Sequence, residues 1–189
     1  MSPIQLLPSV IYLLAAAGLA MYLRLRGGKG IPWLIGTAVS IAVAVMLVWL
    51  RGRLPLSIIA MDWMPFTTFS DAPMLALDGQ SWPYSFALSV VLAGIYLTAS
   101  ARMSAMESAW PWVGTLVTGG ISLLAIQASN FMTIVLTWTA LDLFDAVLVS
   151  TRYSGAANRR QVVIGFGARV ISSLLVIFAA LINRSLGIA

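Results

Sequence analysis

The segment FMTIVLTWTALDLFDAVLVS (residues 131–150) is long and apolar, yet it carries two carboxylates, Asp142 and Asp145. About 20 residues of helix at 1.5 Å each span the hydrocarbon core of a bilayer. A carboxylate near the middle of a bilayer costs about 2.5–3.5 kcal/mol, so it is expected to face a partner group or a wet cavity. This stretch therefore predicts a membrane helix that carries an ionisable site.

The rest of the chain repeats the apolar pattern, since 60% of all residues are apolar and only 9% are charged. The alternation of apolar and polar residues that a membrane barrel needs is absent. We therefore predict an all-α integral membrane protein, a single membrane domain over residues 1–189. Its outer loop covers residues 51–81, where the alternating segment Met74–Leu77 predicts a short strand or hairpin. The six predicted transmembrane helices cover residues 4–23, 31–50, 82–101, 110–129, 131–150 and 161–182.

The residue types that are missing exclude several kinds of site. The chain has no Cys and no His, so it offers no thiolate nucleophile, Cys-ligated zinc or cluster site, or His-ligated haem. We expect no metal site, no cofactor and no catalytic residue of its own. The net charge of +5 lies largely in short loops between apolar segments, where membrane topology explains it, so no nucleic-acid partner is expected.

The distribution of basic residues predicts the orientation of the helices. Basic side chains of inner loops normally outnumber those outside. One side of the predicted bundle carries the larger basic set, and the other carries three arginines together with Asp62, Asp71 and Asp78. Both termini are therefore expected on the outer side of a bacterial inner (cytoplasmic) membrane or an organellar inner membrane. The larger basic set consists of Arg24, Arg26, Lys29, Arg102, Arg152, Arg159 and Arg160.

A third charge, Arg169, lies inside the last apolar segment. That segment follows residues 131–150 after a short polar loop, so the two helices are expected to be antiparallel neighbours. Asp142 and Arg169 then both lie about 12–14 Å from the inner boundary. Asp145 is one turn beyond Asp142 on the same helix face. The sequence thus predicts that Arg169 pairs with Asp142, Asp145 or both.

Three roles for this intramembrane charge cluster remain open from the residues alone. It could be a structural pair that fixes the register of two helices, a relay for protons or cations, or a helix contact to another subunit. A polar face at Thr115, Thr118 and Ser122 could line a hydrated seam or hydrogen-bond neighbouring helices.

Two short motifs resemble those of antiporter-like membrane subunits, the large membrane subunits of respiratory complex I and of multi-subunit cation–proton antiporters. The segment Leu75-Ala-Leu-Asp-Gly-Gln-Ser81 resembles the family's Leu-Asp-Gly-Leu-Ser pattern, with Asp78, Gly79 and Ser81 at matching positions. Residues 129–139, which include Asn130 and Trp138, resemble its Asp-Asn-Leu … Phe-Trp-Glu helix. The predicted outer amino terminus and the long outer loop agree with this resemblance.

The chain also departs from the family pattern. The family's proton path uses a glutamate directly after that tryptophan and a lysine on a later helix. Thr139 occupies the glutamate position, and Lys29, the only lysine, lies in a loop. Family members have about fourteen helices in two inverted repeats, so this chain would correspond to part of the first repeat.

The resemblance implies a membrane subunit similar to the first six helices of an antiporter-like subunit. Its expected role is mainly structural or connecting, in a larger proton- or cation-translocating complex. A redox-linked, NADH–quinone oxidoreductase-like assembly and an antiporter complex are the two expected kinds. Its expected partners are other membrane subunits and the lipid bilayer. The alternative is an autonomous, oligomeric ion transporter or channel that uses Asp142 and Asp145.

Overall fold

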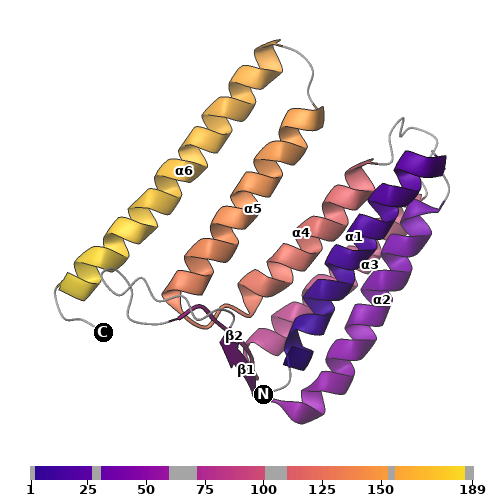
Figure 1. Cartoon of the computed structure of the whole chain (residues 1–189), viewed down its shortest axis with the longest axis horizontal. Coiled ribbons are helices and arrows are strands. Elements are labelled where there is room, and N and C mark those ends of the chain that lie inside the picture. The colour runs from indigo at the N-terminus through magenta and orange to yellow at the C-terminus, as the bar shows by residue number, and fades with distance from the viewer. Residues whose placement is uncertain (1–2, 27–30, 60–71, 101–109, 153–155, 186–189) are drawn as a thin grey trace.

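A computed structural model describes residues 3–26, 31–59, 72–100, 110–152 and 156–185. Within them the chain forms six long α-helices and one β-hairpin (Figure 1). Two short 3₁₀ turns flank the first two helices, η1 (Pro3–Leu6) before α1 and η2 (Arg51–Arg53) after α2. The other elements are α1 (Leu7–Arg26), α2 (Pro32–Leu50), β1 (Leu56–Ile59), β2 (Met74–Leu77), α3 (Ser81–Ser100), α4 (Trp110–Ile126), α5 (Phe131–Arg152) and α6 (Ala156–Ser185).

Three helices differ from the predicted ranges by three residues or more. The first was expected over residues 4–23 but covers Leu7–Arg26, because Pro3–Leu6 form the 3₁₀ turn η1. The fourth helix was expected to reach residue 129 but ends at Ile126. It ends early because the next residues pair with β2: the Ala76 N–H donates to the Gln127 carbonyl at 2.6 Å, and the Ser129 N–H donates to the Met74 carbonyl at 3.1 Å. The sixth helix is longer than predicted, at 30 residues. Residues 60–71 of the predicted outer loop and the inner-loop residues Lys29 and Arg102 lie outside the described ranges.

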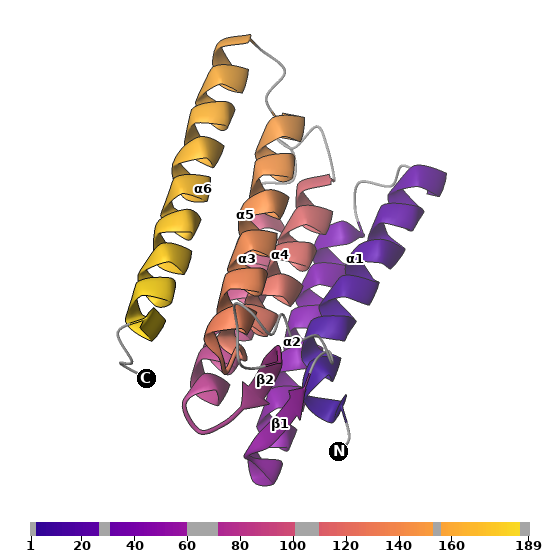
Figure 2. The same ribbon diagram turned by 60° about the vertical axis from the view of Figure 1, so that its left-hand side comes forward.

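The helices form a bundle with a tightly packed part and an open edge. α1 packs mainly against α4, and α2 packs against α3. α5 lies on α4, and α6 lies at the edge of the molecule beside α5 (Figures 1 and 2). Among the described elements, α5 is the only one with which α6 shares an extensive contact. The core is accordingly built mainly from the first four helices, with Leu77 of the hairpin. Its helical members include Tyr12, Leu47, Tyr96, Trp112 and Leu116.

The strand predicted at Met74–Leu77 is confirmed as β2, which pairs antiparallel with β1. The hairpin lies at the end of the bundle where α1 begins and α6 ends (Figure 1). The buried side chain of Gln5 donates to the Leu75 carbonyl at 2.9 Å, and the Met74 N–H donates to Thr133 Oγ1 at 2.7 Å. The hairpin therefore links the start of α1 to the junction between α4 and α5.

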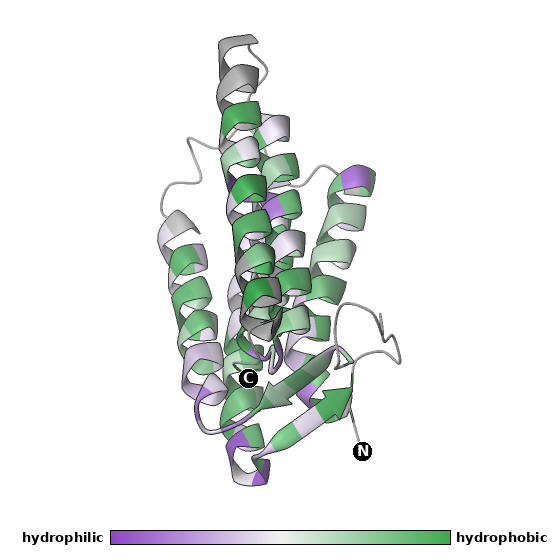
Figure 3. Ribbon diagram, turned by 90° about the vertical axis from the view of Figure 1, so that its left-hand side faces the viewer, coloured by the Kyte–Doolittle hydropathy of each residue, from purple (hydrophilic) through white to green (hydrophobic). Residues whose placement is uncertain are grey.

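The chain is a multi-pass, helical membrane protein. Four segments in the described ranges are long and apolar enough to cross a bilayer, and hydrophobic residues follow one another along much of the helices (Figure 3). α4 has 17 residues and the apolar part of α6 covers Val163–Leu175, so both are shorter than those four. The four candidate spans are Ile4–Leu25, Pro32–Arg53, Ser81–Thr98 and Phe131–Ser150.

Candidate functional site

The three charged residues singled out in the sequence meet at the contact between α5 and α6. The Arg169 guanidinium donates a hydrogen bond to Oδ2 of Asp145. The same guanidinium nitrogen lies 3.9 Å from Oδ1 of Asp142. The Ser173 hydroxyl, one turn along α6, lies 3.5 Å from Oδ2 of Asp142. One arginine thus bridges two carboxylates, with its close contact to Asp145.

Helix periodicity explains why these side chains meet. Asp142 and Asp145 are three residues apart on α5, and Arg169 and Ser173 are four apart on α6, so each pair shares one helix face. The side chain of Asp142 is 18% exposed, whereas those of Asp145 and Arg169 are 45% and 47% exposed. The described part of the chain therefore encloses this cluster only on one side. Two carboxylates beside one guanidinium also leave one formal negative charge.

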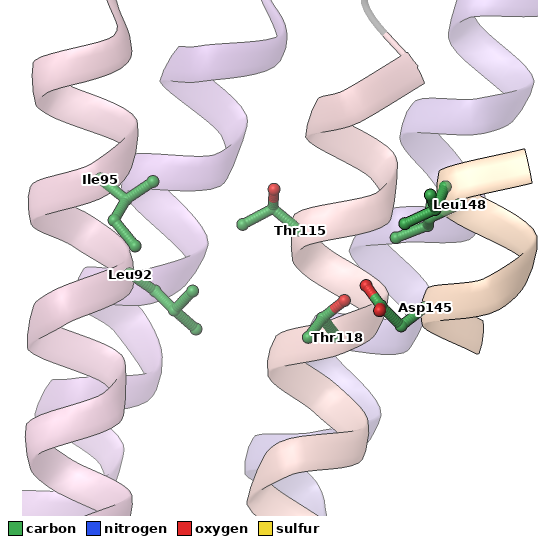
Figure 4. A pocket seen from close by; sticks show the side chains of 7 residues that line it. Leu92, Ile95, Thr115, Thr118, Asp145 and Leu148 are labelled. Carbon is green, nitrogen blue, oxygen red and sulfur yellow. The ribbon is translucent and has the colours of Figure 1, made fainter. Parts of the chain in front are cut away.

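A pocket of about 280 Å³ opens beside Asp145, between α3, α4 and α5 (Figure 4). The Asp145 side chain points from α5 toward α4, where Thr115 and Thr118 face the same space (Figure 4). Both threonine hydroxyls donate to carbonyls of their own helix at 3.0 Å, those of Pro111 and Gly114. Their acceptor lone pairs are thus left for the pocket. The rest of the lining is apolar: Leu92, Ile95, Leu148 and Val149.

The motif residues at the start of α3 form a helix cap. Oδ1 of Asp78 accepts hydrogen bonds from the N–H groups of Ser81 at 2.7 Å and Gln80 at 2.9 Å. The Asp78 N–H donates back to the Ser81 hydroxyl at 2.8 Å. The Ser81 N–H, followed by the Ser81 hydroxyl, holds the pKa of Asp78 below its ordinary value. Gly79 lies in the exposed turn between the two partners. The observed contacts of these residues fix the entry of α3.

Asn130 plays the same part for α5. Its Oδ1 accepts from the Thr133 N–H at 2.9 Å, which is the pattern of an amino-terminal cap, and its Nδ2 donates to the Ala72 carbonyl at 2.5 Å. The start of α5 is therefore tied to the chain that leads into β2. This capping end lies about 17 Å along α5 from Asp142, so the motif caps and the charge cluster are separate features.

The last two motif positions lie on the surface of α5. Trp138 is 60% exposed and Thr139 is also exposed. Neither lines the pocket beside Asp145. Ser173 was not among the partners predicted for Asp142. Its spacing of one helical turn from Arg169 is the signal that could have found it.

Comparison with solved structures shows that this fold is similar to that of a known membrane protein. A chain in the structure of the membrane-bound sulfane sulfur reductase, an archaeal respiratory membrane complex, superimposes on 98% of this chain with a TM-score of 0.66. The two chains are 21% identical in sequence, and this chain spans 28% of the length of the other. The likeness therefore establishes a shared membrane fold. No protein-family model and no curated protein matches the sequence.

Proposed function

We propose that this chain is a membrane subunit similar to the first six helices of an antiporter-like subunit, with a mainly structural or connecting role in a larger proton- or cation-translocating complex. The main support for this proposal is the exposure of the charge cluster formed by Asp142, Asp145 and Arg169. Ionisable side chains at this depth face the interior of a bundle or a water-filled cavity. Asp145 and Arg169 are nearly half exposed on the described chain, so protein from another subunit is needed to cover them.

The proposed arrangement in the membrane has six spans with both termini outside. α4 and α6 run beside the four longer candidate spans in the same layer (Figures 1 and 2), which supports counting them as spans. The excess of basic residues at the end opposite the hairpin supports placing that end inside. A bacterial inner membrane or an organellar inner membrane fits this orientation.

Within such a complex the cluster would tie α5 to α6 rather than move protons by itself. Arg169 is held by both carboxylates, and Thr139 stands where the resembled family has its glutamate. The chain also lacks an intramembrane lysine, because Lys29 lies between the first two helices. A proton path through this protein would therefore need groups from a partner.

Purification tests this proposal. The full chain, tagged in its native host and extracted in a mild detergent, should copurify with other membrane subunits in fixed proportions. The same chain purified alone and reconstituted in liposomes should conduct neither protons nor monovalent cations. Recovery as a monodisperse single chain that transports ions would contradict the proposal.

The second candidate is an autonomous, oligomeric ion transporter or channel that uses Asp142 and Asp145. The pocket beside Asp145 favours it, since a carboxylate and two threonine hydroxyls surround a space large enough for a partly hydrated cation. In that case the purified chain would conduct ions in liposomes, and Asp145→Asn would abolish the flux while oligomer assembly persisted. Trp138→Phe, on the same helix but outside the pocket, is the matched control.

A further inference from the structure

Two arginines at the hairpin end of α2 are stacked on tryptophans. The Arg53 guanidinium carbon lies 4.0 Å from the centre of the Trp49 ring. The Arg51 guanidinium carbon lies 4.9 Å from the centre of the Trp82 ring on α3. Both arginines lie in η2, separated by one glycine, and both are exposed. They form what we call the arginine–tryptophan pair site: Arg51, Arg53, Trp49 and Trp82.

The rings of this site are themselves held in place. The Trp82 indole N–H donates to the Leu47 carbonyl on α2 at 2.6 Å, so the ring is tied to both helices. The Trp82 ring also stacks on the ring of Phe86, nearly parallel to it, with 5.6 Å between the ring centres. A guanidinium over such a fixed ring loses little further freedom when it binds a ligand. This stacking therefore prepares Arg51 for recognition.

The donors of the two guanidinium groups have no hydrogen-bond or carboxylate partner among the residues that the structure describes. A guanidinium carries five N–H donors in its own plane, and this fork matches the oxygens of a phosphate. Contact of that plane with a ring leaves its edges free. The pair site thus presents two oriented forks to its surroundings.

The pair site also lies at the boundary of the membrane layer. The candidate span that contains α2 ends at Arg53, and the one that contains α3 begins at Ser81. Trp49 is half exposed at this level, and tryptophan at the end of a span is typical of the headgroup region. The hydrophilic end of α2 is visible at the bottom of Figure 3. Phospholipid phosphates lie at this depth.

We propose that Arg51 and Arg53 bind a phosphate group, and that the position of the site assigns this phosphate to a membrane lipid headgroup. Trp49 and Trp82 orient the two guanidinium groups beside the acyl chains of the same lipid. This inference is independent of the proposed function, because it uses none of the residues of the α5–α6 cluster. A purely structural role would be stacking at the carboxyl end of α2, where a positive charge also suits the helix dipole.

Native mass spectrometry of the purified full chain distinguishes a lipid-binding role of the two arginines from a purely structural one. The chain is titrated with phosphatidylglycerol, with diacylglycerol of the same acyl chains, and with inorganic phosphate. The double variant Arg51→Gln/Arg53→Gln should bind phosphatidylglycerol about tenfold more weakly than the native chain. The charge-matched control Arg24→Gln/Arg26→Gln removes two arginines from the opposite end of the bundle and should bind as the native chain does.

The lipid titrations decide the proposal. Preference for phosphatidylglycerol over diacylglycerol, lost only in the Arg51/Arg53 double variant, supports a phosphate site that serves a lipid. Displacement of phosphatidylglycerol by inorganic phosphate at similar concentration supports the phosphate chemistry but assigns the site to a soluble anion. Equal binding of both lipids, or equal losses in the two double variants, overturns the proposal. Circular dichroism verifies that each variant retains its helices.

Discussion

The contact between Gly36 on α2 and Tyr96 on α3 gives the sharpest test of the packing. A Cβ atom added at Gly36 would lie 2.3, 2.4 and 2.6 Å from three atoms of the Tyr96 ring. An ordinary contact begins near 3.4 Å, so Gly36→Ala needs the ring or the helix to move by about 1 Å. Every other substitution of Gly36 demands more space.

The ring cannot yield easily. Tyr96 is fully buried, its ring stacks on Trp112 at 5.5 Å between centres, and its hydroxyl donates to the Trp112 carbonyl at 3.0 Å. The two helices must therefore separate, at a cost of about 1–3 kcal/mol for overpacking. At about 2–4 °C for each kcal/mol, Gly36→Ala should lower the melting temperature measurably.

Thermal unfolding of the purified full chain in detergent, followed by tryptophan fluorescence, measures this loss. Gly94→Ala on α3 is the matched control, since a Cβ there meets nothing within 4 Å. That change should be neutral or stabilise the helix by about 0.5–1 kcal/mol. Melting of Gly36→Ala at or above the temperature of Gly94→Ala would refute the close approach of α2 and α3.

Three further predictions use the same unfolding assay. Asp78 has a pKa below its ordinary value of 3.8, so its cap stabilises the fold fully above that pH and is lost as the pH falls through the lowered pKa. Asp78→Asn should therefore reduce stability at pH 7 and remove the loss of stability at acid pH. If the variant lost stability at acid pH as the native chain does, that result would contradict the cap. Asn130→Ala removes the cap of α5 and its bond to Ala72, and should cost about 1 kcal/mol; an unaltered melting temperature would argue against it. Arg169→Gln should lower the melting temperature more than Asp145→Asn, because it leaves two carboxylates side by side without a cation. Restoration of the melting temperature by the exchange Asp145→Arg/Arg169→Asp would identify the close pair. Equal losses in the two single variants would count against this pairing.

The long elements and the partners of the charge cluster could be predicted from the sequence. Apolar length alone places six helices, and the alternation at Met74–Leu77 indicates β2. Depth along antiparallel neighbours brings Asp142 and Arg169 to one level, with Asp145 one helical turn away. The number of residues from a helix end gives the depth of a side chain but not the rotation of its helix about the axis. The close contact between Arg169 and Asp145 could therefore not be predicted.

The remaining features depend on contacts between segments far apart in sequence. α4 ends early because residues 127–129 pair with β2. The local sequence around residues 127–129 does not predict this pairing. The pocket beside Asp145 needs side chains from three helices at once. Asp78 and Asn130 were singled out because they match motifs of a family that the chain resembles. In the structure their side chains cap the amino-terminal ends of α3 and α5.

If another polypeptide covers the charge cluster, photo-crosslinking in the native membrane should capture it. The reporter is p-benzoylphenylalanine in place of Trp138, an exposed aromatic position one turn from Asp142. We expect an ultraviolet-dependent adduct between the full chain and one different membrane protein. Adducts with lipid alone, or with a second copy of this chain, would contradict it.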